Sequence, residues 1–567
     1  MDGPKRCVLI SDFNLDNLAA YLAKDQSEPR LLPVTAPFGQ VVPALIDGSA
    51  RHWAGAPAYA VVWTRPEAAA GAFARLLDGD EVDETALLRD VDAFAAAIRE
   101  AAGRVSTLLV ASWVWPPDRH GLGMLDFRPN LGGAWALARM NARLAEQLAD
   151  LPNTFVLDAR RWISRAGETA ASPKLWYAAK VPYGHAVFKA AVDDLKSAFA
   201  AAAGRSRKLV VVDLDDTLWG GVVGEDGWQH LNLGGHDPVG EAFADVQREL
   251  RRLARRGILL AIASKNDEAV ALEAIAKHPE MILAPSDFAA WRINWHDKAR
   301  NIVELAKELN LGLQSIVFID DSPAERSRVA QALPEVFVPD WPEDKLLAAS
   351  ALRRLHCFES TGISDEDRRR TKLYAAERER AALLEPTGSV EDWIRSLEIS
   401  VNVEALAPAN LQRAAQLLNK TNQMNLATRR LSETDLWTWS QAEHRRFWTF
   451  RVADRFGDAG LTGLASAELS GTTLRVVDFV LSCRVIGRSV EDVMVQTVID
   501  HAVAHGAKDV VFEYRPTAKN APCLQYLETS RLEAREAGVF AWDASRRFEP
   551  PTHVTIVREE SAALSAR

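Results

Sequence analysis

The chain has 567 residues, of which 48% are hydrophobic and 25% are charged, as in an ordinary soluble protein. Its net charge of −10 argues against a nucleic acid or an anionic membrane as the main partner. Because one domain takes about 150 residues, the length predicts three or four domains. The first apolar run is too short for a signal peptide, and no apolar stretch has spanning length, so we expect a cytoplasmic protein.

Residues 1–204 alternate apolar stretches with helical patterns. This alternation is typical of a parallel sheet covered by helices. The predicted strands are Arg6–Ile10, Tyr59–Trp63, Thr107–Ser112 and Asn153–Leu157, and one helical pattern covers Leu131–Leu151.

The loop SDFN at residues 11–14, with Gly39 downstream, resembles the opening of the SGNH hydrolases. The resemblance implies a flavodoxin-type α/β domain in which a nucleophilic serine follows an aspartate. Phe13 occupies that place here, and phenylalanine cannot be a nucleophile. Ser11 could substitute only in a different register, and His185 lacks the aspartate that such enzymes carry three residues earlier. We therefore expect a non-catalytic domain that serves docking or packing.

The stretch KLVVVDLDDTL, at residues 208–218, contains an apolar run, Leu209–Val212, that ends abruptly in acids. In open parallel sheets, reacting groups gather at the carboxyl ends of the strands. Asp213 and Asp215 could therefore serve one site, one as a nucleophile and the other as a proton carrier. The alternative is a polar strand end that merely starts a loop.

Three more polar groups follow apolar strands or begin helices in the same region. Ser264 follows the predicted strand Ile258–Ala263, where it could also cap the next helix, and Lys298 stands near the start of another helix. Asp320 and Asp321 follow an apolar strand, and adjacent carboxylates repel one another unless a cation lies between them. Hard oxygen ligands of this kind favour Mg²⁺.

These four signals, in this order, resemble those of the haloacid dehalogenase-like (HAD) phosphohydrolases. The resemblance implies a Rossmann-like parallel sheet in residues 205–345 and no large cap. It assigns Asp213 as the nucleophile, Asp215 as the acid and base, and a hydroxyl of Ser264 and the ammonium of Lys298 as phosphoryl ligands. The metal would be held by Asp213, the backbone carbonyl of Asp215 and Asp320, with Asp321 close behind. An open site of this kind admits a phosphate carried on a macromolecule or on another domain.

From residue 205 to about 557 the sequence resembles the FkbH-like proteins. The motifs that carry this resemblance are DLDDTLWGGVVGEDG, SKND, HPEMIL, WHDKARNI and FIDDSPAER. Members of that family make glyceryl thioesters on acyl carrier proteins. The resemblance implies D-1,3-bisphosphoglycerate as a small three-carbon substrate, Mg²⁺ as a cofactor, and a carrier protein with its phosphopantetheine thiol as the partner.

A charged, helical linker is predicted over residues 346–395, and an α+β domain over residues 396–560. In that domain an apolar strand, Val476–Leu481, leads through a loop into an amphipathic helix. Successive N–H groups at a helix start form a phosphate cradle. The loop resembles the pyrophosphate loop of GNAT acyltransferases, which bind coenzyme A, and its candidate binding residues are Arg484, Gly487, Arg488 and Ser489.

Cys483 stands just before this helix start, beside Arg484. A positive neighbour and a helix amino terminus both lower a thiol pKa, and only the thiolate attacks well. The alternative is a small core residue at a strand end. The phrase SCRVIGR resembles the FkbH-like proteins and favours an acyl-carrying thiol.

The first hypothesis is therefore a phosphatase and glyceryl transferase that loads a carrier protein for polyketide-type biosynthesis. A plain Mg²⁺-dependent phosphatase with a partner-binding GNAT-like domain is the alternative. A third hypothesis is a non-catalytic assembly factor, against which Asp213, Asp215, Lys298 and Asp320 all argue.

Overall fold

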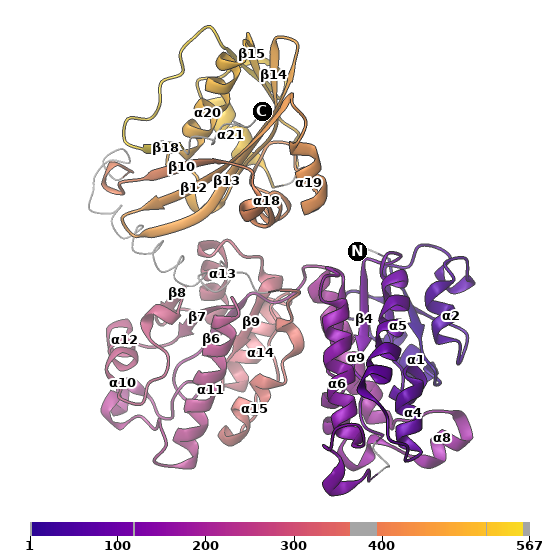
Figure 1. Ribbon diagram of the computed structural model, residues 1–567. Helices are drawn as coiled ribbons and strands as arrows, with labels where there is room; N and C mark the ends of the chain where they lie inside the picture. Colours follow the sequence, from indigo (N-terminus) through magenta and orange to yellow (C-terminus); the bar gives the residue numbers. More distant parts are fainter. Residues whose placement is uncertain (1–2, 117–119, 363–393, 518, 559–567) are drawn as a thin grey trace. The chain divides into compact units, whose positions relative to one another are not determined.

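Figure 1 shows the computed structural model of the chain, which describes residues 3–116, 120–362, 394–517 and 519–558. In these residues, three β-sheets with their own helices follow one another along the sequence. Two α/β domains, a helical linker and an α+β domain were expected in this order. Most of the predicted linker, including its charged stretch Ser364–Pro386, lies outside the described residues, and the exact domain boundaries remain predictions.

The first sheet is parallel throughout, with the strand order β2-β1-β3-β4-β5. Its strands are β1 (Lys5–Ile10), β2 (Leu31–Thr35), β3 (Tyr59–Val62), β4 (Thr107–Ala111) and β5 (Thr154–Leu157). Its main helices are α1 (Asp16–Lys24), α2 (Val41–Ile46), α4 (Gly71–Leu77), α5 (Glu84–Ala102), α6 (Gly133–Leu148), α7 (Arg160–Ala166), α8 (Pro173–Ala179) and α9 (His185–Ala202).

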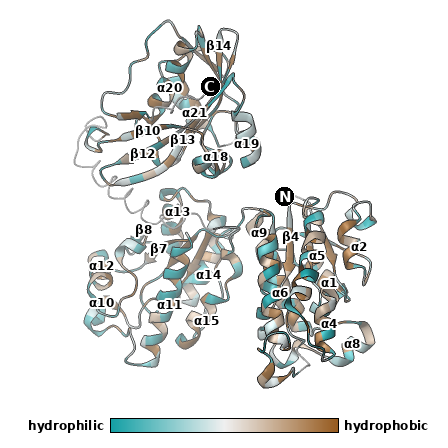
Figure 2. Cartoon of the chain, viewed as in Figure 1, coloured by the Kyte–Doolittle hydropathy of each residue, from teal (hydrophilic) through white to brown (hydrophobic). Residues whose placement is uncertain are grey.

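Both faces of this sheet are buried, because successive side chains of a strand point to opposite faces. Val8 packs with α2, α4, α5 and α6 on one face, whereas Leu9 packs with α1, α7 and α9 on the other. Figure 2 shows β4 in the hydrophobic colour between helices that carry hydrophilic residues. Burial on both faces explains the near-continuous apolar runs that predicted these strands.

Strand β2 was not predicted from the sequence. It lies at the edge of the sheet and contains Pro33, which cannot donate a ladder hydrogen bond. A proline inside an apolar run argues against a central strand, so an edge strand of this kind gives little signal.

The second sheet has the order β8-β7-β6-β9, and β6 pairs with β9 in parallel. Its strands are β6 (Leu209–Val212), β7 (Leu259–Ser264), β8 (Ala290–Ile293) and β9 (Ile316–Ile319). Its helices include α10 (Val223–Asp226), α11 (Pro238–Arg255), α12 (Glu268–Lys277), α13 (Lys298–Glu308), α14 (Pro323–Ala332) and α15 (Ala348–Arg353). The predicted strands Leu209–Val212 and Ile258–Ala263 agree with β6 and β7 to within one residue at each end, and the apolar strand predicted before Asp320 is β9.

The third sheet is mostly antiparallel, and its main path runs β16-β17-β15-β14-β13-β12-β10-β18. Its strands are β10 (Ser400–Ala405), β11 (Met424–Asn425), β12 (Arg445–Asp454), β13 (Gly457–Ser470), β14 (Thr473–Leu481), β15 (Asp509–Glu513), β16 (Glu533–Glu536), β17 (Val539–Asp543) and β18 (Thr555–Arg558). Its helices include α18 (Pro408–Lys420), α19 (Glu433–Ser440), α20 (Val490–Ala504) and α21 (Ala521–Thr529). The predicted strand–loop–helix passage is present as β14, a loop and α20.

No described helix has both the length and the apolarity that a membrane crossing requires.

Phe13, the residue in the place of an SGNH nucleophile, is part of the core of the first sheet. Its ring packs edge-on against Trp63 and Tyr183, and the side chain is 2% exposed. Phe13→Ala should destabilise this part of the chain by about 3–5 kcal/mol, because it leaves a cavity. Urea denaturation compares it with Phe38→Ala, an exposed control expected to change stability by less than about 0.5 kcal/mol. Equal, small effects of the two variants would contradict a packing role for Phe13.

Candidate active site

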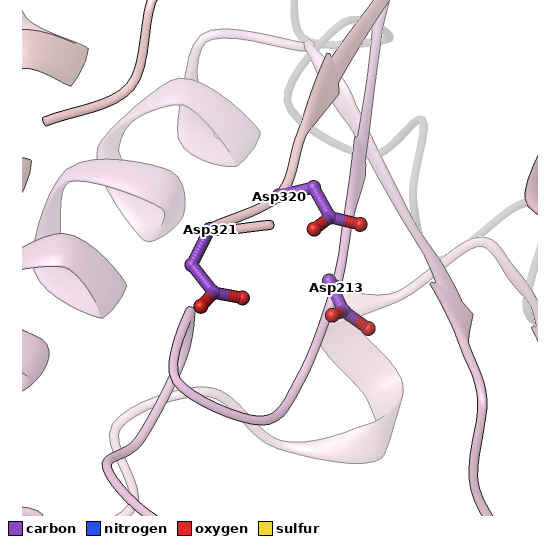
Figure 3. Close-up of side chains that lie close together, drawn as sticks. All are labelled: Asp213, Asp320 and Asp321. Atoms are coloured by element: carbon purple, nitrogen blue, oxygen red, sulfur yellow. The ribbon is translucent and has the colours of Figure 1, made fainter. Parts of the chain in front are cut away.

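The acids at the ends of β6 and β9 meet because the two strands are parallel neighbours in register. Val212 is paired with Ile319, so the next residue of each strand, Asp213 and Asp320, comes at the same edge of the sheet. The Asp213 N–H also donates to the Ile319 carbonyl (3.0 Å). Figure 3 shows the carboxylates of Asp213, Asp320 and Asp321 grouped around one space, and an oxygen of each lies within 4.8 Å of the others.

Lys298 reaches this group from the first turn of α13. Asp297 caps the helix by accepting the N–H groups of Ala299 and Arg300, which fixes where the helix begins. The Lys298 Nζ lies 2.8 Å from Asp213 Oδ2 and 2.6 Å from Asp320 Oδ2, and the side chain is almost fully buried. The predicted cation therefore lies beside the predicted nucleophile.

Burial sets the electrostatics of this cluster. It raises the pKa of Asp213 to about 6, a rise that the Lys298 ammonium opposes and the Asp320 carboxylate strengthens. Burial also raises the pKa of Asp320, against the opposing Lys298 ammonium. Burial alone would lower the pKa of Lys298, but the two carboxylates outweigh it and raise that pKa. One ammonium thus balances two buried carboxylates only in part.

The remaining groups fit a divalent cation. Asp213 Oδ1 is buried and has no hydrogen-bond partner within the described residues, which is costly for a carboxylate oxygen. Asp321 accepts a hydrogen bond from the Thr217 hydroxyl (3.3 Å) and lies 3.3 Å from the Lys345 ammonium. An all-oxygen donor set with an unpartnered buried oxygen suits Mg²⁺. The role of the Asp215 carbonyl as a ligand remains a prediction.

Ser264 ends β7 and is 1% exposed. Its alternative role as a helix cap is wrong, because Asp267 caps α12 by accepting the N–H groups of Ala269 and Val270. The Ser264 hydroxyl instead forms a hydrogen bond that helps to lower the pKa of Asp213, against the larger effect of burial. It is therefore at the site that the sequence predicted.

Sequence reasoning missed two cations that shape the site. Lys345 Nζ donates to the Asp216 carbonyl (2.7 Å) in addition to its contact with Asp321. Arg326 donates to the carbonyls of Asp320 (2.8 Å) and Asp321 (2.6 Å), and so fixes the turn between β9 and α14. Neither residue has neighbours in sequence that single it out, although Arg326 follows the acids by one to two helical turns.

The loop before α20 differs from a free phosphate cradle. The Gly487 N–H donates to the Glu491 carboxylate (2.7 Å), and Ser489 Oγ lies 3.0 Å from His553 Nε2. Arg488 is buried and lies 3.6 Å from an Asp454 oxygen. The other predicted cradle residue, Arg484, donates to the Ser482 hydroxyl (3.3 Å).

A cavity of about 310 Å³ adjoins this loop, and its lining includes Gly487, Ser489, Glu491, Tyr526 and Arg531. Burial raises the pKa of Glu491 to about 7, although the Gly487 N–H opposes the rise. A buried carboxylate therefore occupies the helix start at which a ligand phosphate was predicted.

The side chain of Cys483, the predicted acyl-carrying thiol, lies outside the described part of the chain, and its role stays a prediction. Its backbone begins a short 3-10 helix at residues 483–485, after β14 and Ser482. Burial raises the pKa of Cys357 and of Cys523 to about 12, and raises that of Cys7 as well. These three thiols are therefore poor nucleophiles near neutral pH.

In the first sheet the SGNH-type pair is not assembled. Ser11 is buried, and its hydroxyl accepts the Phe13 N–H (3.1 Å), whereas His185 lies within hydrogen-bond distance of the Tyr21 hydroxyl (3.0 Å). Ser11 lines a cavity of about 240 Å³ together with Asn14 and Phe38.

Comparison with protein-family models found no match, and comparison with curated proteins found none either. Among solved structures, the chain is similar to the N-terminal part of protein BF1531 from Bacteroides fragilis, which contains a phosphatase domain complexed with Mg. The two are 25% identical, with a TM-score of 0.58, over 64% of this chain and 95% of that one. This share is larger than residues 205–345 alone could supply, so the likeness extends beyond the second sheet.

Two acetyltransferases also match about a quarter of the chain. One is ribosomal-protein-S18-alanine N-acetyltransferase from Escherichia coli, which is 12% identical with a TM-score of 0.20 over 25% of this chain and 94% of that one. The other is spermidine N-acetyltransferase from Vibrio cholerae, which is 14% identical with a TM-score of 0.21 over 26% of this chain and 96% of that one. TM-scores this low do not establish a shared fold.

Mg²⁺ should stabilise the chain by binding the three acids. At a concentration of about 100 times its Kd, the metal adds about 2.7 kcal/mol. Thermal unfolding with and without Mg²⁺ measures the effect, which should vanish in Asp320→Asn and persist in Asp340→Asn, an exposed control. Equal Mg²⁺ stabilisation of both variants would place the metal elsewhere.

Proposed function

We propose that the second sheet carries a Mg²⁺-dependent phosphatase site that acts through Asp213. The observation that carries this proposal is the convergence of Asp213, Lys298, Asp320 and Asp321 at one buried strand edge. The solved structure with a phosphatase domain complexed with Mg supports it, as does the order of the sequence motifs.

The reaction begins when an Asp213 oxygen attacks the phosphorus of a phosphomonoester. The bond to the leaving oxygen breaks as Asp215 gives that oxygen a proton, and a phosphoaspartate remains. Asp215 then takes a proton from water, whose oxygen attacks the phosphorus and releases phosphate. Lys298 and the Ser264 hydroxyl offset charge on the phosphoryl oxygens. Bound Mg²⁺ would polarise the phosphoryl group and screen it from the carboxylates.

We further propose that the phosphatase serves a glyceryl transferase. A Cys483 thiolate would attack the acyl carbon of D-1,3-bisphosphoglycerate, forming a thioester and releasing inorganic phosphate. The Asp213 site would then remove the remaining phosphate. Finally, the phosphopantetheine thiol of an acyl carrier protein would take the glyceryl group and free Cys483. The sequence words that resemble the FkbH-like proteins support this route, and so do the high pKa values of the Cys357 and Cys523 thiols.

A second candidate is a plain phosphatase whose third part only binds a partner. It is favoured by the loop before α20, because the Gly487 N–H and the Arg488 side chain already have partners within the chain. Both candidates use the same Asp213 site, so they differ only in the fate of the acyl group.

Asp213→Asn should reduce phosphate release by at least about 10⁴-fold, because the amide is a poor nucleophile and a weak metal ligand. Malachite-green detection of phosphate measures the loss, and circular dichroism should show an intact fold. Asp245→Asn, on the surface of α11, is the matched control and should retain activity. Normal turnover by Asp213→Asn would exclude this nucleophile.

Cys483→Ala should abolish loading of the carrier protein while it preserves hydrolysis of a simple phosphomonoester. Intact-protein mass spectrometry after incubation with D-1,3-bisphosphoglycerate and Mg²⁺ follows the acyl group. The wild-type chain gains a glyceryl increment, and Asp213→Asn retains the phosphorylated form of the same adduct. Cys357→Ala is the control. Loading by Cys483→Ala at the wild-type rate would contradict the route through this thiol, and would favour another cysteine or direct attack by the pantetheine thiol.

A further inference from the structure

The carboxylate of Asp215 is held by three donors from three different positions in the fold. Its Oδ1 accepts the indole N–H of Trp219 (2.9 Å) and the backbone N–H of Val223 (3.1 Å). Its Oδ2 accepts an amide N–H of Asn266 (2.9 Å). Trp219 is 0% exposed and Asn266 is 5% exposed, so these donors are not exchanged freely with water.

Asn266 makes a second contact with the same amide nitrogen. Its Nδ2 also donates to Ser264 Oγ (3.1 Å), so the two amide hydrogens reach Asp215 and Ser264 at once. An amide nitrogen has only two hydrogens to give. The short segment from Ser264 to Asn266 therefore fixes the relative positions of two groups that act on the phosphoryl centre.

The arrangement determines which oxygen of Asp215 can handle a proton. An ionised carboxylate has about four lone-pair sites, two on each oxygen. Trp219 and Val223 fill those on Oδ1, whereas Asn266 fills one on Oδ2, and no other donor from the described residues reaches the second. Proton transfer to a leaving oxygen must then pass through Oδ2.

The same amide also orders the serine hydroxyl. Because Ser264 Oγ accepts from Asn266, its own hydrogen is directed to another acceptor. Asn266 thus connects the group that transfers a proton with the group that faces the nucleophile.

We propose that Asn266 and Trp219 are positioning residues that aim Asp215 Oδ2 at the leaving oxygen of the phosphomonoester. The inference rests on the proposed phosphatase function and names the residues that make its proton transfer efficient. Neither side chain touches the phosphoryl group in this role, so both act through Asp215.

The basicity of the leaving oxygen distinguishes a positioning role of Asn266 and Trp219 from a packing role. An alkyl leaving oxygen is strongly basic and needs a proton as its bond to phosphorus breaks, whereas a p-nitrophenolate leaves without one. A variant that misplaces Asp215 should therefore lose the alkyl ester selectively in the first step. Water attack on the phosphoaspartate, which needs Asp215 as a base, should slow for both esters.

The experiment compares Asn266→Ala and Trp219→Phe in the full-length chain with 3-phosphoglycerate and p-nitrophenyl phosphate, both with Mg²⁺. For 3-phosphoglycerate, kcat should fall by at least about tenfold with KM little changed, since general acids contribute about 10²–10⁴-fold. With p-nitrophenyl phosphate, stopped flow should show a burst of one nitrophenolate per chain, followed by slow turnover. Trp341→Phe, a buried tryptophan of the same part of the chain, is the matched control and should give wild-type kinetics.

Parallel losses on the two esters without a burst, in both variants, would overturn the inference and leave only a packing role. Wild-type kinetics in Asn266→Ala would overturn it as well. Two variants are used because both side chains are buried and each substitution removes volume, whereas the only property that the two share is the loss of a donor to Asp215. Failure of the proposed phosphatase function would be seen in the wild-type chain itself, which would then release no Asp213-dependent phosphate from either ester.

Discussion

The buried contact of the Lys298 ammonium with Asp213 and Asp320 is the interaction on which the rest of the site depends. Two carboxylates at adjacent strand ends repel each other in a medium of low dielectric constant. Removing one partner of a buried ion pair lowers the free energy of unfolding by about 3–5 kcal/mol. Lys298 relieves this repulsion in part, and the acids that remain uncompensated suit a divalent cation. The excess negative charge of the cluster destabilises the fold, and the same excess charge attracts the metal that a phosphoryl group needs.

The positions of these charges follow from the sheet. Parallel pairing of β6 with β9 brings Asp213 to Asp320, and the end of β7 brings Ser264 to the same edge. Lys298 arrives separately, through a helix whose start is fixed by the Asp297 cap. Local rules of strand ends and helix caps therefore combine to place groups that are far apart in the sequence.

These local rules explain how much could be predicted. The apolar runs that end in acids indicated β6 and β9, and the roles of Asp213, Lys298 and Asp320 as neighbours followed from a family resemblance. The donors around Asp215 could not be predicted, because Trp219 and Asn266 look like core and turn residues until the loops fold onto one another. The Glu491 carboxylate was missed for a similar reason, since it fills a helix start that the sequence suggested for a ligand.

The central claim is that Asp213 becomes phosphorylated during turnover. The most direct measurement is an acid quench of the wild-type chain within a single turnover of a phosphomonoester in Mg²⁺, followed by peptide mass spectrometry. The account predicts a phosphoryl group on the peptide that contains residues 209–218, localised to Asp213 and absent when the metal is removed. A phosphoryl group on another residue, or phosphate release with no phosphorylated chain at any time point, would contradict it.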